Sequence, residues 1–335
     1  MAAYTTIDDP SAYFKVQLYT GNGSANHAIT FDDTDTDMQP DLVWIKNRDA
    51  TDAHMIFDSV RGATIHWDSA TSAAEVDDDD TLDSFASDGF QVDADDKVNT
   101  NTEDYCSWNW KESATSGFDI VGYTGTGSAH TISHSLSAKP GMFILKSRSR
   151  VANGQVWHNK LSADSKILYL STNHSEQEHG AIHNSTQPTS SVFTVGSASE
   201  SNDDGETYIA YLWAEKQGFS KFGQYVGNGS ATGPFIYTGF RPAIIGIKKR
   251  SAIGSWYTFD NKRDPFNSGG GNWLELQEPY AETGPSTALS ADFLSNGFRW
   301  TGTNAGINGD GVSYLYWAFA EAPFVNSNGV PCNAR

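Results

Sequence analysis

The hexapeptide Tyr19-Thr-Gly-Asn-Gly-Ser24 occurs three times in this chain, with close copies at Tyr123-Thr-Gly-Thr-Gly-Ser128 and Tyr225-Val-Gly-Asn-Gly-Ser230. Each copy is followed by an apolar segment that begins at a proline and ends in Lys-x-Arg, at 40–48, 140–148 and 242–250. The motif tyrosines lie 104 and 102 residues apart. This period is the size of a small domain and much longer than one rung of a solenoid, so the sequence predicts three copies of one compact unit.

Three further blocks recur in the same order after Lys-x-Arg. They are a short apolar strand with a polar residue, a segment with Phe followed by Gly, and an aromatic strand that starts at Tyr105, Tyr208 or Tyr314. We therefore expect an all-β protein of three tandem β-sandwich-like domains packed closely together. A pseudo-threefold prism or a propeller-like arrangement of the sheets is the alternative. The expected divisions are an N-terminal arm (1–12), three β repeats (13–111, 112–215 and 216–321) and an extended C-terminal tail (322–335).

Composition supports sheet-rich domains. Of 335 residues, 13% are aromatic and only 19% are charged, so long helices are not expected. The net charge of −19 is concentrated in residues 1–111, which hold 23 acidic residues against 6 basic ones, whereas residues 216–335 hold 8 against 10. Such an acidic chain repels phosphate backbones, so we expect no nucleic-acid partner.

The two cysteines, Cys106 and Cys332, are too few for a disulfide framework. The chain begins without a basic region and an apolar core, and it has no run of 18 apolar residues. We expect no membrane insertion. We expect the chain to fold where thiols stay reduced and, if it acts outside the cell, to be released by lysis.

The segment 13–19 alternates so that Phe14, Val16 and Leu18 share one face of a strand. The Gly-x-Gly that follows lacks the third glycine and the Lys of a phosphate-binding loop, so it predicts a tight turn. The next strand, 40–48, is almost continuously apolar, which predicts burial on both faces. Its Lys46 and Arg48 could grip carboxylates or sugars. Because the pair recurs in every unit, we favour a structural role, with each cation paired to an acid of its own unit such as Asp58 or Asp260.

Two acidic stretches are candidate calcium ligands, because hard cations prefer oxygen donors. One is Asp-Asp-Thr-Asp-Thr-Asp at 32–37; the other is Asp77, Asp78, Asp79 and Asp80. EF-hand spacing is absent from both, so we interpret them as solvated acidic loops and predict no metal and no cofactor. Glu178, His179 and His183 imitate the spacing of zinc ligands on a helix, but Gly180 and the flanking polar residues disfavour a helix there.

We find no signature of an enzyme. A Gly-x-Ser-x-Gly elbow, a phosphate-binding Walker loop and His-Glu-x-x-His are all missing. The recurrent residues are aromatic residues, Gly, Pro and a Lys/Arg pair, which build strands and turns. We therefore predict no catalytic residues and assign no binding residues. A pair of glycosidase carboxylates contributed by distant strands would leave no local motif, so it stays an alternative.

Three passages carry a resemblance to a known family. They are the opening Tyr4-Thr-Thr-Ile-Asp-Asp-Pro-Ser-Ala-Tyr-Phe14, the motif with Pro40-Asp-Leu-Val-Trp-Ile-Lys-Asn-Arg48, and the ending from Phe319 to Arg335. Together they resemble a triplicated-repeat family of structural proteins in tailed bacteriophages of marine bacteria. Unit two departs from the pattern, with Trp157-His158 where the others have Phe-Asp.

The resemblance implies a non-enzymatic protein on the virion surface, as a capsid decoration or fibre, or as part of the tail and host-recognition apparatus. The implied partners are other virion proteins and further copies of the same chain. A carbohydrate-binding adhesin that recognises host surface glycans is the alternative function, because exposed aromatic and amide side chains suit sugars. A polysaccharide depolymerase is the third reading.

Overall fold

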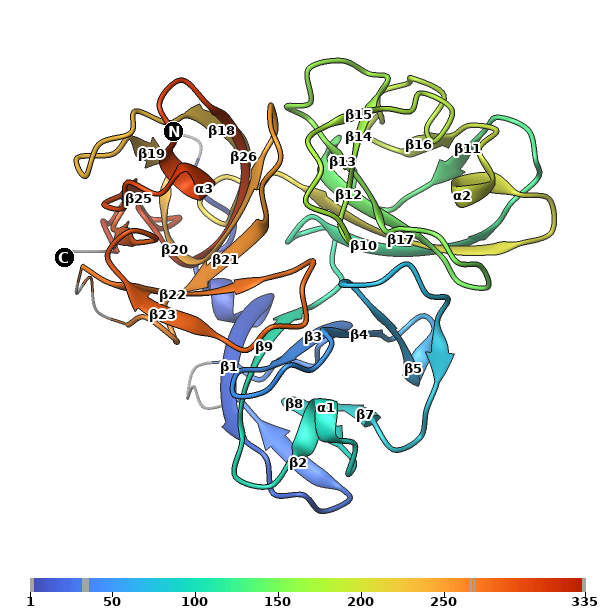
Figure 1. The fold of residues 1–335 in the computed structure, drawn as a ribbon, viewed down its shortest axis with the longest axis horizontal. Helices are drawn as coiled ribbons and strands as arrows, with labels where there is room; N and C mark the ends of the chain where they lie inside the picture. Colours follow the sequence, from blue (N-terminus) through green and yellow to red (C-terminus); the bar gives the residue numbers. More distant parts are fainter. Residues whose placement is uncertain (1–2, 32–35, 266, 268, 333–335) are drawn as a thin grey trace.

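The structure is a computed structural model that describes residues 3–31, 36–265, 267 and 269–332. Strands account for 44% of it and helices for 5%, which confirms the predicted all-β class. Figure 1 shows three lobes around a common centre, coloured blue to teal, green to yellow, and orange to red along the chain. We call them units 1, 2 and 3. Each contains one large sheet and one small sheet, so each is a small β-sandwich.

Unit 1 begins with a strand that leads into the repeated hexapeptide and ends with an aromatic strand. Its elements are β1 (Phe14–Thr20), β2 (His27–Thr30), β3 (Leu42–Asn47), β4 (Met55–Asp58), β5 (Gly62–Asp68), β6 (Val76–Asp77), β7 (Leu82–Ala86), β8 (Gly89–Val92), α1 (Asp96–Asn99) and β9 (Asp104–Trp110). The large sheet has the order β1-β9-β3-β4-β5-β6, and the small sheet has the order β2-β8-β7.

Unit 2 has the same large sheet. Its elements are β10 (Phe118–Thr124), β11 (His130–Ser133), β12 (Pro140–Ser147), β13 (Gln155–His158), β14 (Lys166–Tyr169), β15 (Gln177–Glu178), β16 (Val192–Val195), α2 (Ser199–Asn202) and β17 (Thr207–Ala214). The six-stranded order is β10-β17-β12-β13-β14-β15, and β11 pairs with β16 in the small sheet.

Unit 3 repeats the arrangement with longer strands. Its elements are β18 (Ser220–Val226), β19 (Phe235–Tyr237), β20 (Phe240–Lys249), β21 (Trp256–Asp260), β22 (Gly271–Glu275), β23 (Thr283–Ser286), β24 (Ala291–Leu294), β25 (Gly297–Trp300), α3 (Ala305–Asn308) and β26 (Ser313–Pro323). The sheets have the orders β18-β26-β20-β21-β22-β23 and β19-β25-β24.

The repeated hexapeptide is the turn that follows the first strand of each unit. A Cβ on its first glycine, Gly21, would lie 2.1 Å from the carbonyl oxygen of Thr100, so only glycine fits against the loop after α1. Its second glycine, Gly23, has a φ of +64°, which favours glycine. The side chain of Asn99 accepts a hydrogen bond from the backbone N–H of Asn22 at 2.9 Å. The predicted turn is confirmed, and its glycines are explained by backbone packing.

The strand predicted to be buried on both faces is β3, and all six of its residues are buried. Val43 and Ile45 face the small sheet of unit 1, whereas Leu42 and Trp44 face a core that is shared by all three units. The large sheets therefore form the walls of the common centre, and the small sheets lie outside them.

The N-terminal arm docks on unit 3. Thr5 and Ile7 are buried at 3% and 2% exposure, and the hydroxyl of Tyr4 donates to the carbonyl of Gly239 at 2.8 Å. A short 3-10 helix, η1 (Pro10–Ala12), leads from the arm into β1. The arm thus connects the first unit to the last. The three units therefore form a closed ring, in which each unit contacts the other two.

The tail does not run extended as predicted. β26 continues to Pro323, and Val325 then forms a bridge with Pro331. The side chain of Asn326 causes this turn, because it accepts hydrogen bonds from the backbone N–H groups of Asn328 and Val330. Among the described residues, no helix is long and apolar enough to cross a bilayer.

Candidate functional site: the junctions between units

The arginine of each Lys-x-Arg motif binds a glutamate of another unit. The pairs are Arg48 with Glu282 at 2.8 Å, Arg148 with Glu75 at 2.9 Å, and Arg250 with Glu176 at 4.0 Å. The same glutamates donate their backbone N–H to the carbonyl of the same arginines at 2.8, 2.9 and 3.0 Å, respectively. Unit 1 therefore holds unit 3, unit 2 holds unit 1, and unit 3 holds unit 2.

This cycle corrects the predicted partner of Arg48. The structural role is present, and Arg48 does lie 4.0 Å from an acid of its own unit, Asp104. Its closer partner at 2.8 Å is nevertheless Glu282 of unit 3, while Asp58 pairs with Arg61. Burial lowers the pKa of Arg48, and the hydrogen bond and charge of Glu282 raise it by more, so the net shift is upward. Sequence reasoning missed the three glutamates. The available signal is their position, because each one directly precedes the last strand of its large sheet, β6, β15 or β23.

The motif lysines are buried and bind backbone carbonyls. Lys146 donates to Ala152 of its own loop at 2.5 Å and to Ser72 of unit 1 at 3.2 Å. Lys248 donates in the same way to Gly254 and to Thr172 of unit 2. Burial lowers the pKa of Lys146 to about 8 and that of Lys248 to about 7. Both lysines thus hold the loop that follows them against the neighbouring unit.

A second polar contact recurs at each junction, at the end of the fourth strand. Asp58 accepts a hydrogen bond from the hydroxyl of Tyr211 in unit 2 at 2.7 Å, and Asp260 accepts one from the indole N–H of Trp108 in unit 1 at 3.1 Å. His158 takes this position in unit 2, where its Nε2 lies 3.2 Å from the carbonyl oxygen of Tyr316 in unit 3. Unit 2 thus departs from the sequence pattern but keeps the junction.

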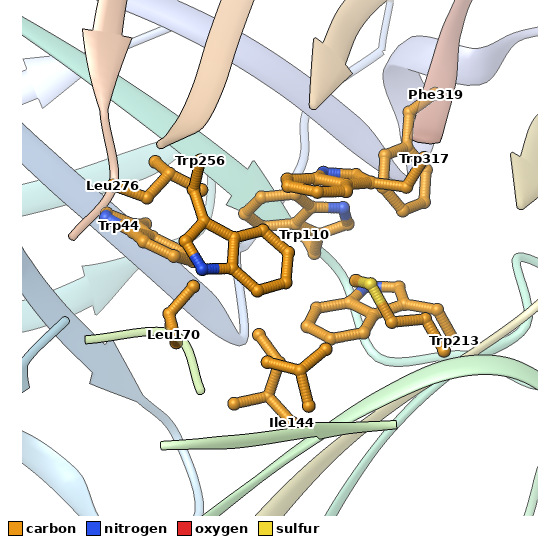
Figure 2. Close-up of a pocket in the computed structure, with 11 residues that line it drawn as sticks. Trp44, Trp110, Ile144, Leu170, Trp213, Trp256, Leu276, Trp317 and Phe319 are labelled. Atoms are coloured by element: carbon orange, nitrogen blue, oxygen red, sulfur yellow. The ribbon is translucent and has the colours of Figure 1, made fainter. Parts of the chain in front are cut away.

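A cavity lies at the centre of the ring, between the three large sheets. Figure 2 shows aromatic and aliphatic side chains from all three units around it, including Trp44, Trp110, Trp213, Trp256 and Trp317. Its volume is about 20 Å³, which is room for one water molecule. The lining is apolar, so the cavity is a packing defect of the shared core and is too small for a sugar or a cofactor.

A protein family model covers nearly the whole chain. The model of a domain of unknown function, DUF7483, matches residues 9–323, from the arm to the end of β26. The chain belongs to the DUF7483 family. Since the match spans all three units, the DUF7483 domain is the whole ring and not one repeat. No curated protein matches the chain.

The candidate calcium ligands of this DUF7483 chain are spread along β6 and the turn after it. Asp77 accepts from the hydroxyl of Thr64 at 2.6 Å, and Asp78 accepts from the backbone N–H of Asp80 at 3.2 Å. Asp77, Asp79 and Asp80 are exposed. Within the described ranges, no three His, Cys, Asp or Glu residues come together as metal ligands. The other acidic stretch falls largely on residues 32–35, which lie outside the described residues.

The histidines with zinc-like spacing do not lie on a helix. His179 lies 3.9 Å from Glu200. The Nε2 of His183 lies 3.2 Å from the carbonyl oxygen of Lys166, and burial lowers the pKa of this histidine. These two side chains thus serve local contacts within unit 2.

Two pairs of carboxyl groups share a hydrogen bond, Asp83 with Asp93 in unit 1 and Glu112 with Asp119 at the joint between units 1 and 2. Burial and a hydrogen bond shared with Asp119 raise the pKa of Glu112 to about 7. Hydrogen-bonded oxygens are about 2.5–3 Å apart, whereas glycosidases separate their two carboxyl groups by about 5 Å or more. Both pairs therefore lack the spacing of a glycoside hydrolase, and neither pair lines the central cavity or the two clefts beside the N-terminal arm.

Proposed function

We propose that this DUF7483 protein is a non-enzymatic structural protein on the surface of a tailed phage virion, as a capsid decoration or fibre, or as a tail-associated component. One observation carries the proposal. The arginine that recurs in every unit contacts a neighbouring unit, and two of the three recurrent lysines do so as well, so the repeated positions build a scaffold. The resemblance of the opening, the motif and the ending to a phage structural family supplies the location.

The closed ring suits a building block. Its units share one aromatic core, and the connections between them are short, from Trp110 to Phe118 and from Ala214 to Ser220, so the body presents a fixed outer surface to partners. Unit 1 carries most of the acidic residues, whereas unit 3 is close to neutral. Unit 3 is therefore the part that contacts other proteins with the least electrostatic repulsion. We expect several copies of the chain in a particle.

Labelling purified virions with a gold-conjugated antibody against this chain tests the location. The expected result is label on the head or tail, together with stoichiometric rebinding of the protein to particles stripped of it. A protein that is absent from purified particles and stays in the lysate would contradict the proposal.

A reducing-sugar assay on host polysaccharide tests the non-enzymatic part. We expect no release of reducing ends. Release that depends on the protein would replace the structural proposal with a depolymerase.

A further inference from the structure

The small sheets of the three units differ on their outer faces. In each unit an isoleucine of the edge strand pairs with a phenylalanine of the next strand, as in Ile29 with Phe90, Ile132 with Phe193 and Ile236 with Phe298. This common register aligns the residues on either side. Unit 1 has Ala28 and Thr30 there, and unit 2 has Thr131 and Ser133. Unit 3 has Phe235 and Tyr237.

Both aromatic side chains of β19 face solvent, Phe235 at 48% exposure and Tyr237 at 53%. Alternate residues of a strand share a face and are about 7 Å apart. Neither aromatic side chain packs in the core, which contains Ile236, the residue between them. Exposed aromatic rings at positions that hold small or polar residues in both other units indicate a surface for binding, because folding does not require them.

A cleft of about 240 Å³ opens beside Tyr237. Its walls include Tyr4 of the arm, Glu215 and Gln217 of the joint between units 2 and 3, and Lys221 of β18. The hydroxyl groups of Tyr4 and Tyr237 are 3.2 Å apart. This volume is below that of a drug-sized pocket, so the cleft holds one ring-sized group, and the remainder of a ligand would lie over the β19 face.

The charges of the cleft cancel. The ammonium of Lys221 lies 2.5 Å from the carboxylate of Glu215, and both side chains are partly exposed. Beside Phe235, Arg299 pairs with Asp292 at 2.6 Å. Neither pair leaves a net charge for a charged ligand. What the surface offers is ring faces, tyrosine hydroxyls, an amide and polar atoms of ion pairs.

We propose that the cleft and the β19 face of unit 3 bind a neutral oligosaccharide, with Tyr237 as the stacking ring at the cleft and Phe235 as a second platform. Sugars combine apolar C–H faces with many hydroxyl groups, which matches aromatic rings flanked by hydrogen-bonding groups. The remaining acidic surface of the chain disfavours polyanions. This site adds a ligand to the proposed structural role, and it exists on the purified protein whether or not the chain is part of a virion.

Binding of the purified chain to immobilised hexasaccharides tests the proposal, with cellohexaose, laminarihexaose, maltohexaose and mannohexaose as neutral probes and an alginate hexamer as the acidic one. We expect at least one neutral probe to bind. Titration calorimetry with that probe should show about tenfold weaker binding for Tyr237→Ala, the loss expected for one aromatic contact. Tyr237→Phe keeps the ring and should retain most of the affinity.

Tyr280→Ala is the matched control, because Tyr280 is 57% exposed in the same unit but does not line the cleft. It should bind like the parent, and thermal melting should show that all three variants fold. Failure of every neutral probe, binding of the alginate hexamer alone, or equal affinity of Tyr237→Ala and the parent would each overturn the proposal. Virion labelling is read separately, so the location can fail while the sugar site stands.

Discussion

Replacing Asp260 with alanine should strongly destabilise the protein. The Asp260 carboxylate lies 2.6 Å from the Nε of Arg263, and both side chains are fully buried. Burial lowers the pKa of Arg263, but the charge of Asp260 and the groups around it raise it by more, so the guanidinium stays charged. The same carboxylate accepts from Trp108 across the junction between units 3 and 1. Alanine therefore leaves a buried cation without its nearest counter-charge and an indole N–H without its acceptor.

The expected loss is about 4 kcal/mol. Removing one partner of a buried ion pair costs about 3–5 kcal/mol. Arg263 keeps two partners, Glu282 at 3.0 Å and the carbonyl of Thr258. The cost of the uncompensated charge is therefore at the lower end of this range, about 3 kcal/mol. The unsatisfied indole adds roughly 1 kcal/mol. For a chain of this length the loss corresponds to a fall of about 6 °C in Tm.

Urea unfolding followed by tryptophan fluorescence measures this loss, and the double variant Asp260→Ala/Arg263→Leu tests its cause. Unit 2 has Leu161 where unit 3 has Arg263, so a leucine is compatible with the fold at this position. The double variant should be more stable than Asp260→Ala by at least ~1 kcal/mol, because the uncompensated charge is gone.

Asp292→Ala is the control, since its partner Arg299 is 43% exposed and the pair contributes at most about 1 kcal/mol. The reasoning is refuted if Asp260→Ala costs no more than this control, or if the double variant is the least stable of the three.

Three further substitutions test other parts of the structure. Gly246→Ala should destabilise by roughly 1–3 kcal/mol or more in the same unfolding assay, because its Cβ would lie 1.8 Å from the ring of Trp317; an unchanged midpoint would show that the core is looser than described. For His158, burial lowers the pKa to about 4, whereas the unfolded side chain titrates near 6.5. Its contribution is therefore complete above pH 6.5 and is lost as the pH falls towards 4. Between pH 6.5 and 4.5 the free energy of unfolding of His158→Gln should fall by about 2 kcal/mol less than that of the parent, and parallel pH profiles would disprove this. Arg148→Met should cost no more than ~1 kcal/mol, because the pair with Glu75 is partly exposed, and added salt should shrink the difference; a larger, salt-independent loss would contradict this ranking.

Much of the fold could be predicted from the sequence because its signals are local. The alternation in 13–19 and the apolar segment 40–48 correspond to β1 and β3. The repeated Gly-x-Gly marks turns whose geometry depends on a few neighbouring residues. The order of blocks in each repeat matches the order of strands along the chain, but not their order in the large sheet, where the aromatic last strand lies between the first strand and the Lys-x-Arg strand.

The junctions could not be predicted in full, because a repeat shows that units are copies and does not show which surfaces meet. Arg48 contacts Glu282, which is 234 residues away, and nothing near Arg48 in the sequence points to it. The cleft of unit 3 has the same character, since Tyr4 and Tyr237 meet only because the arm closes the ring. Phe235 and Tyr237 break the pattern of the repeat, but their exposure became visible only with the register of β19.

Differential scanning calorimetry tests most directly whether the recurrent residues join the three units into one body. If the units share a core and close a ring, the chain unfolds in one transition whose calorimetric and van't Hoff enthalpies agree, with a ratio of about 1. A ratio near 3, or three resolved transitions, would show three independent domains and would contradict the account.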